Sequence, residues 1–318
     1  MEEFSPSFPL KNGHLSTIWP TLFRKDSHVF KRTRITTTDQ DFLDLDWHIQ
    51  DNKKLLIIGH GLEGSSNSTY VIGLAKNAIQ AGYDILAINW RGCGGEPNHK
   101  FESYHTGKSA DLHEVINHVL EQYSYPSIFY CGFSMGGNIG LKYAGETSDK
   151  INTRIKAICA VSTPVDLESS SYQLAKPQNK IYMLRFLRTL KNKYLEKVSQ
   201  FPEQELDTKK ILEAKSFLEF DQHFTAPANG FKSAKDYWTK SSSKPYLAKI
   251  RVNTLLINSL NDPFLAPACF PYKEAKANNK LHLEITKYGG HVGFIEAPSK
   301  LETTWAEKKV LEFLEKNW

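Results

Sequence analysis

A chain of 318 residues with 24% charged residues and a net charge of +5 has an ordinary globular composition, long enough for one large α/β domain or two smaller ones. The positive surplus is too small to indicate nucleic-acid binding, and we expect no nucleic-acid partner. The longest aliphatic run, LLII at 55–58, is far shorter than the ~20 residues of a membrane span.

The N-terminus and the cysteines predict a cytoplasmic protein. The first residues, MEEFSPSFPL, are acidic and interrupted by proline, so we expect no secretory signal. The cysteines lie far apart, and two of them, Cys131 and Cys159, fall in apolar, strand-like runs. We expect all of them to be reduced and mostly buried, as in proteins of the cytosol.

The first half of the chain alternates between apolar strands and amphipathic helices. Residues 28–50 alternate loosely about a turn at 39–41 and predict an opening β-hairpin. Strands are expected at 54–60, 83–90, 127–133 and 155–162, with helices at about 69–80, 109–122 and 136–145 between them. The strands are apolar throughout, which favours an α/β fold with a mostly parallel central sheet and helices on both faces.

This alternation stops near Asp166 and resumes with strands at 252–260 and 281–289 and a last amphipathic helix. The residues between, about 167–245, have irregular helical character and are rich in lysine and aromatic side chains. An insertion of this kind between two strands of a parallel sheet indicates a cap or lid. We therefore expect a single domain over 1–318, with an N-terminal extension and hairpin over 1–50 and a cap over about 167–245.

The stretch GFSMGG at 132–137 places Ser134 between an apolar strand and a helix. In that context Gly-x-Ser-x-Gly is typical of a nucleophile elbow, a turn so tight that glycines must flank a serine raised above the sheet edge. A serine at the start of a helix also has the amide of Met135 beside any negative charge that develops there. The alternative is a glycine-rich turn with an incidental serine.

A serine nucleophile needs a base, and the base needs an acid to orient it. In a fold with this elbow the acid and then the base follow the serine along the chain. Asp262 lies in NSLNDPFLAP after one apolar strand, and His291 lies in KYGGHVGF after the next. Taken singly, Asp262 could form an Asx turn and His291 could be an ordinary loop residue. Their order favours a Ser134–His291–Asp262 triad.

Such a triad works with an oxyanion hole made by the amide after the serine and an amide from the loop after the first parallel strand. That loop is GHGLEGSS, residues 59–66. We assign the two donors to the backbone amides of Met135 and Leu62. His60 is expected to shape the loop rather than take part in the chemistry.

The same loop also matches a dinucleotide-binding pattern, Gly59-x-Gly61-x-x-Gly64. Against a nucleotide site, SSNS separates the glycines from the next helix, and the next strand ends in INWRG without a carboxylate for a ribose. That interpretation also leaves the three candidate catalytic residues unexplained. HEVINH at 113–118 resembles a zinc-protease motif, but histidines five residues apart diverge on a helix. We expect neither a cofactor nor a metal.

With these residues in place, the chain resembles the YheT-like branch of the α/β-hydrolase superfamily, which includes bacterial carboxylesterases and eukaryotic lipid hydrolases. The likeness runs nearly end to end and rests on long stretches such as KNGHLSTIWPTLFR, GHGLEGSSNSTY, NWRGCGGEPN, YHTGKSADL, GFSMGGNIGLKY, FDQHFTAPANGFKSAKDYW and GGHVGF. The resemblance implies an α/β-hydrolase fold, a charge relay of Ser134, Asp262 and His291, and no cofactor.

We therefore expect a serine hydrolase that cleaves small-molecule or lipid carboxylic esters through an acyl-enzyme. The alternatives are an acyltransferase that passes the acyl group to an alcohol, and a non-catalytic binding protein that keeps the fold. Substrate choice would rest with the cap, whose aromatic residues either line an acyl pocket or form the cap's own core.

Two further features carry weaker expectations. A predicted helix near 180–198 has a basic face that is either solvated or in weak peripheral contact with an anionic membrane. Its basic residues are Lys180, Arg185, Arg188, Lys191, Lys193 and Lys197. His105 and Asp111, in YHTGKSAD, are expected to support a loop near the site.

Overall fold

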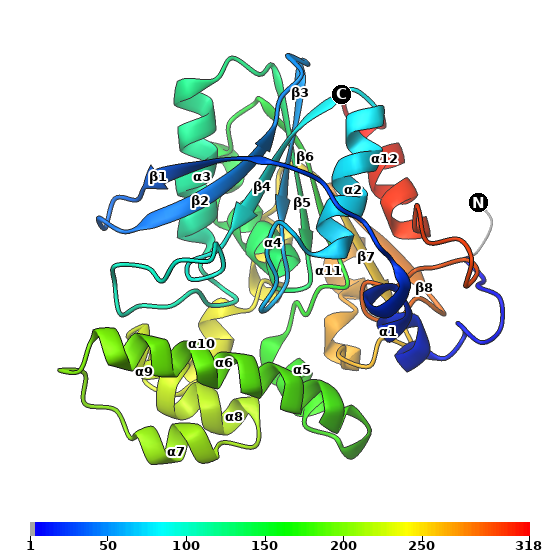
Figure 1. Cartoon of the computed structure of the whole chain (residues 1–318). Helices are drawn as coiled ribbons and strands as arrows, with labels where there is room; N and C mark the ends of the chain where they lie inside the picture. Colours follow the sequence, from blue (N-terminus) through cyan, green and yellow to red (C-terminus); the bar gives the residue numbers. More distant parts are fainter. Residues whose placement is uncertain (1–3) are drawn as a thin grey trace.

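Figure 1 shows the computed structural model of the chain, which describes residues 4–318. These residues form one eight-stranded sheet in the order β1-β2-β4-β3-β5-β6-β7-β8. The strands are β1 (Lys31–Thr36), β2 (Phe42–His48), β3 (Lys54–Gly59), β4 (Tyr83–Asn89), β5 (Ser127–Phe133), β6 (Ile155–Val161), β7 (Asn253–Ser259) and β8 (Leu281–Thr286). β1 and β2 form the predicted hairpin, β2 also pairs antiparallel with β4, and all other pairs are parallel.

Helices cover both faces of the sheet (Figure 1). Buried side chains of α3 (Ser109–Gln122) and α4 (Met135–Thr147) share one apolar core with the sheet, and those of α2 (Thr69–Gln80) and α12 (Trp305–Lys316) share the other. Both faces of the central strands are therefore buried, and every residue of β5 is buried. This double cover explains the continuous apolar runs in the sequence.

The N-terminal segment contains a helix that the sequence analysis did not predict, α1 (Gly13–Phe23). It begins at Asn12, whose side chain accepts the backbone amides of His14 and Leu15 at 2.9 and 3.1 Å. The hydroxyl of Ser16 donates to the carbonyl of Gly289 at 2.9 Å. This contact joins α1 to the loop that follows β8.

Between β6 and β7 the chain forms a layer of helices beyond the carboxyl ends of the strands (Figure 1). We call residues 167–241 the cap. Its helices are α5 (Leu167–Leu174), α6 (Lys180–Gln200), α7 (Thr208–Glu213), α8 (Phe217–Phe220), α9 (Ala226–Ala228) and α10 (Ala234–Ser241), with a π-helical turn at Asp221–Thr225. The cap has its own apolar core, centred on Leu187, Tyr194, Phe220 and Phe224.

Short elements complete the described chain. They are α11 (Tyr272–Ala277) and 3₁₀ turns at Ser148–Lys150, Pro177–Asn179, Lys244–Lys249 and Pro267–Cys269. Within residues 4–318, no helix combines the length and the apolar character needed to cross a bilayer. The cysteines of this part of the chain form no disulfide; Cys131, Cys159 and Cys269 are buried, and Cys93 is half-buried.

Candidate active site

Ser134 stands at the turn from β5 to α4, with a positive φ of 51°. A Cβ on Gly132 would lie 2.2 Å from the carbonyl oxygen of Gly136, and one on Gly136 would lie 2.4 Å from that of Gly59. Neither position can hold a larger residue without moving the backbone. A non-glycine residue at positive φ stores backbone strain of the kind found at functional sites. The turn therefore has the geometry expected of a nucleophile elbow.

The structure brings the three predicted triad residues into one hydrogen-bonded chain. His291 Nε2 lies 2.9 Å from Ser134 Oγ, and His291 Nδ1 lies 2.8 Å from Asp262 Oδ2. The side chain of Asp262 is fully buried, and its Oδ1 accepts the amide of Phe264 at 2.8 Å. A carboxylate fixed in this way keeps the imidazole proton on Nδ1 and leaves Nε2 free to accept the serine proton.

Residues outside the three positions hold His291 in place. Its backbone amide donates to Thr17 Oγ1 of α1 at 2.8 Å, and the ring of Phe264 lies against the imidazole, with 4.2 Å between the centroids. Next to it, the amide of Gly290 donates to Asn261 Oδ1 at 2.9 Å. Sequence reasoning missed Thr17 and Phe264 as supports. Two signals in the sequence could have indicated them: Thr17 lies in KNGHLSTIWPTLFR, a stretch on which the family resemblance rests, and Phe264 lies two residues after Asp262 in NSLNDPFLAP.

The amides of Leu62 and Met135 lie beside the same serine. A Cβ on Gly61 would be 3.2 Å from Ser134 Cβ, so the loop of residues 59–66, which we call the β3–α2 loop, packs directly against the elbow. Within residues 4–318, neither amide donates a hydrogen bond to another protein group. Both residues line a cavity and could therefore donate to a ligand. Their role as an oxyanion hole remains a prediction.

His60 has the shaping role that the sequence analysis predicted. It is completely buried, its Nδ1 donates to the carbonyl of Gly61 at 2.7 Å, and its Nε2 accepts the amide of Trp90 at 3.2 Å. These two contacts require the neutral ring, and burial lowers the pKa of His60 to about 3. His60 thus fixes the β3–α2 loop and forms no hydrogen bond with Ser134, Asp262 or His291.

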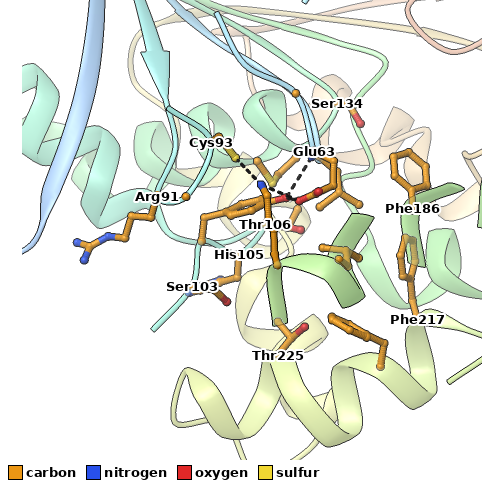
Figure 2. Close-up of a pocket in the computed structure, with 18 of the residues that line it drawn as sticks. Glu63, Arg91, Cys93, Ser103, His105, Thr106, Ser134, Phe186, Phe217 and Thr225 are labelled. Atoms are coloured by element: carbon orange, nitrogen blue, oxygen red, sulfur yellow. Dashed lines mark hydrogen bonds and ion pairs between the residues drawn. The ribbon is translucent and has the colours of Figure 1, made fainter. Parts of the chain in front are cut away.

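A cavity of about 590 Å³ opens in front of Ser134 (Figure 2). Phe186 and Phe217 of the cap face it, together with Phe220 and Phe224, which also belong to the cap core. The two alternatives for the cap aromatics do not exclude each other, since the same rings form the core and line the cavity; binding of an acyl group there remains a prediction. An apolar wall of this size suits an acyl chain.

α6 does not present all six of its basic residues to solvent. Lys191 donates to the carbonyl of Ala214 at 2.6 Å, Lys197 donates to that of Asn98 at 3.1 Å, and Lys193 reaches the cavity. The basic face of α6 is therefore smaller than the six residues of the sequence indicate, because these three lysines turn inward. The exposed outer face carries Lys180, Arg185 and Arg188 beside Ile181 and Leu184. Its contact with lipid remains a prediction.

His105 and Asp111, which were expected to support a loop near the site, connect separate parts of the fold. Asp111 pairs with the buried Arg91 at 2.8 Å, and Arg91 also pairs with Asp39 at the tip of the β1–β2 hairpin. The ring of His105 packs edge-on against Tyr237 of the cap, and burial lowers the pKa of His105 to about 3. His105 borders the cavity. Asp111 does not border it, but its partner Arg91 does.

Comparison with known proteins identifies the family. The model of the α/β-hydrolase fold matches residues 54–298. YheT of Escherichia coli is 31% identical to this chain over 319 aligned positions, which cover 98% of this chain and 93% of that protein. Human phospholipase ABHD3 is 28% identical, over 93% of this chain and 74% of that protein.

Solved structures agree on the fold. The esterase Pf2001 of Pyrococcus furiosus superimposes with a TM-score of 0.60 over 90% of this chain and 92% of that one, at 18% identity. The residues that the family model matches, 54–298, include the elbow at Ser134 and the loops that carry Asp262 and His291. The chain belongs to the α/β-hydrolase family, in the branch that includes YheT.

Proposed function

We propose that this protein is a serine esterase that cleaves carboxylic esters through an acyl-enzyme on Ser134. The observation that carries the proposal is the continuous contact from Ser134 Oγ to His291 (2.9 Å) and from His291 to the buried Asp262 (2.8 Å) at the edge of an apolar cavity. The names of its relatives, which include a phospholipase, and its likeness to an esterase support the same class of reaction.

Each step of the proposed reaction uses a group already in place. Ser134 Oγ attacks the ester carbonyl while His291 Nε2 takes the hydroxyl proton, and the carboxylate of Asp262 stabilises the resulting imidazolium. The amides of Leu62 and Met135 donate to the oxyanion of the tetrahedral intermediate. When the intermediate collapses, His291 returns the proton to the leaving alcohol. Water then attacks the acyl-enzyme by the same route and releases the acid.

The cavity argues for an ester with an apolar acyl group. Phe186, Phe217 and Leu190 give it an aromatic and aliphatic wall on the cap side. Burial of apolar surface against such a wall contributes about 0.8 kcal/mol for each methylene of the substrate. Turnover should therefore favour longer acyl chains over acetate until the cavity is filled. This preference covers both small-molecule and lipid esters.

The test is turnover of p-nitrophenyl esters by wild type and by Ser134→Ala. Loss of the nucleophile should reduce kcat on the order of 10⁶-fold, to background, without changing the melting temperature. Ser199→Ala is the matched control, because Ser199 is exposed at the end of α6 and donates only to the carbonyl of Glu196 at 2.8 Å. Turnover retained by Ser134→Ala would refute the proposal. Product analysis with added ethanol identifies whether water or an alcohol accepts the acyl group.

A further inference from the structure

One ion pair joins the cap to the β3–α2 loop. Lys193 Nζ of α6 lies 3.0 Å from Glu63 Oε1 and 3.1 Å from Cys93 Sγ, and all three residues border the cavity. The dashed lines that meet near Glu63 and Cys93 in Figure 2 mark these contacts. Burial raises the pKa of the Cys93 thiol to about 11, so the thiol is a neutral acceptor and Glu63 is the anion that balances Lys193.

Glu63 is held in an unusual conformation directly after Leu62. Its φ is 57°, a value that a residue with a side chain adopts only when its surroundings impose it. Its backbone amide donates to the hydroxyl of Tyr104 at 3.1 Å, and that hydroxyl donates in turn to the Glu63 carboxylate. The carboxylate thus lies between Tyr104 and Lys193, and its position is tied to the backbone that carries the Leu62 amide.

The other hydrogen bonds that hold this loop come from residues outside the cap. The amide of Gly61 donates to the hydroxyl of Tyr70 at 3.0 Å, and His60 is bound to Trp90. Among the hydrogen bonds and ion pairs of residues 4–318, Lys193 supplies the one contact to the β3–α2 loop that comes from the cap. The placement of the loop therefore depends on the placement of α6.

We propose that Lys193 is a positioning residue, which holds Glu63 so that the Leu62 amide faces the oxyanion that forms on the carbonyl attacked by Ser134. An ion pair largely withdrawn from water adds little net stability, because desolvation offsets the attraction. Its effect on geometry is larger, since the charged partner fixes the direction of the Glu63 side chain. The inference rests on the proposed function, because it assigns the loop a role in that reaction.

The kinetic test uses lysines of the same helix. Loss of a whole oxyanion donor costs about 10²- to 10³-fold in kcat. Lys193→Met keeps the Leu62 amide but removes the ion pair that holds its loop. We therefore expect a smaller fall in kcat, about tenfold, at unchanged KM. Glu63→Gln should give a similar loss, and Lys193→Arg should recover part of it. Lys191→Met is the matched control, because within residues 4–318 Lys191 binds only the cap carbonyl of Ala214, and it does not border the cavity.

Kinetics with substrates of different acyl chain length show whether Lys193 positions the loop or only lines the cavity. If Lys193 acts through the loop, the fold-loss in kcat is the same for p-nitrophenyl acetate and decanoate. If Lys193 only borders the pocket, the loss grows with chain length and appears in KM. The inference is overturned by a chain-length-dependent loss, by wild-type kcat in Lys193→Met, or by an equal loss in Lys191→Met.

A second measurement does not depend on activity. Hydrogen exchange of peptides that cover residues 59–66 should be faster in Lys193→Met than in wild type, and unchanged in Lys191→Met. Equal exchange in all three proteins would show that Lys193 does not hold the loop. If wild type cleaves no ester, the proposed function fails, and the exchange result still decides whether the ion pair fixes the loop.

Discussion

Replacement of Asp262 by asparagine tests whether His291 is the base for Ser134. The two carboxylate oxygens face two donors, since Oδ2 accepts Nδ1–H of His291 and Oδ1 accepts the amide of Phe264, both at 2.8 Å. Asparagine has a single oxygen for these two positions. If that oxygen stays with Phe264, the NH₂ group faces Nδ1 and forces the imidazole proton onto Nε2. The ring then cannot accept the proton of Ser134.

The opposite orientation of the amide is also unfavourable. It restores the contact to Nδ1 but places NH₂ against the Phe264 amide, and a buried donor left without an acceptor costs about 1–3 kcal/mol. That cost alone reduces the productive population about 5- to 150-fold. The negative charge beside the imidazolium is lost as well. For Asp262→Asn we therefore expect kcat to fall on the order of 10⁴-fold.

The assay is turnover of p-nitrophenyl butyrate, with the melting temperature measured on the same samples. Asp149→Asn is the control, because it makes the same substitution at a carboxylate that is 83% exposed and that, among the described residues, pairs only with Arg251. A folded Asp262→Asn protein whose kcat stays within about fivefold of wild type would refute the reasoning, since the flip alone predicts at least that loss.

Three further predictions concern the elbow, the cap core and the outer face of α6. Gly132→Ala puts a Cβ 2.2 Å from the carbonyl oxygen of Gly136, so the free energy of unfolding in denaturant should fall by at least about 1–3 kcal/mol; an unchanged value would contradict the tightness of the turn. Burial raises the pKa of Asp221 to about 6 from its ordinary 3.8, so the folded state binds this proton more tightly, and the stability that the protonated group contributes is lost as pH rises from about 4 to about 6. Asp221→Asn should remove that part of the pH dependence of the melting temperature. If the melting temperatures of the two proteins change with pH in the same way, the pKa of Asp221 is not raised. A solvated outer face of α6 predicts that wild type stays unbound in flotation with anionic vesicles as well as with neutral ones; flotation with anionic vesicles that the double substitution Arg185→Glu and Arg188→Glu abolishes would show instead that this face contacts lipid.

The sheet and most of its helices were predictable because strands buried on both faces are continuous apolar runs, and helices that pack on them have apolar residues at helical spacing. β5 and α3 have the bounds that the apolar run at 127–133 and the helical spacing at 109–122 predict. α1 was missed, because Pro20 interrupts its pattern and few of its residues are buried. Its position depends on contacts with the distant loop after β8, which local periodicity cannot reveal.

The three triad positions were predictable because a nucleophile elbow is a local pattern and the order of acid and base follows from the topology. Their supports were not. Thr17 belongs to α1, and Lys193 of α6 pairs with Glu63 of the β3–α2 loop, which is 130 residues away in the sequence. A lysine that turns inward to a carboxylate distant in sequence has the same local pattern as one on a solvated face, so only the fold distinguishes Lys193 from Arg188.

The reactivity of Ser134 toward a fluorophosphonate tests the central claim most directly. The probe phosphonylates a serine, with release of fluoride, only where a base has activated the hydroxyl and an oxyanion hole receives the P=O oxygen. We predict one adduct per chain, located on Ser134 by peptide mass spectrometry and absent from His291→Ala. An unmodified Ser134, or an adduct formed at the same rate without His291, would contradict the account.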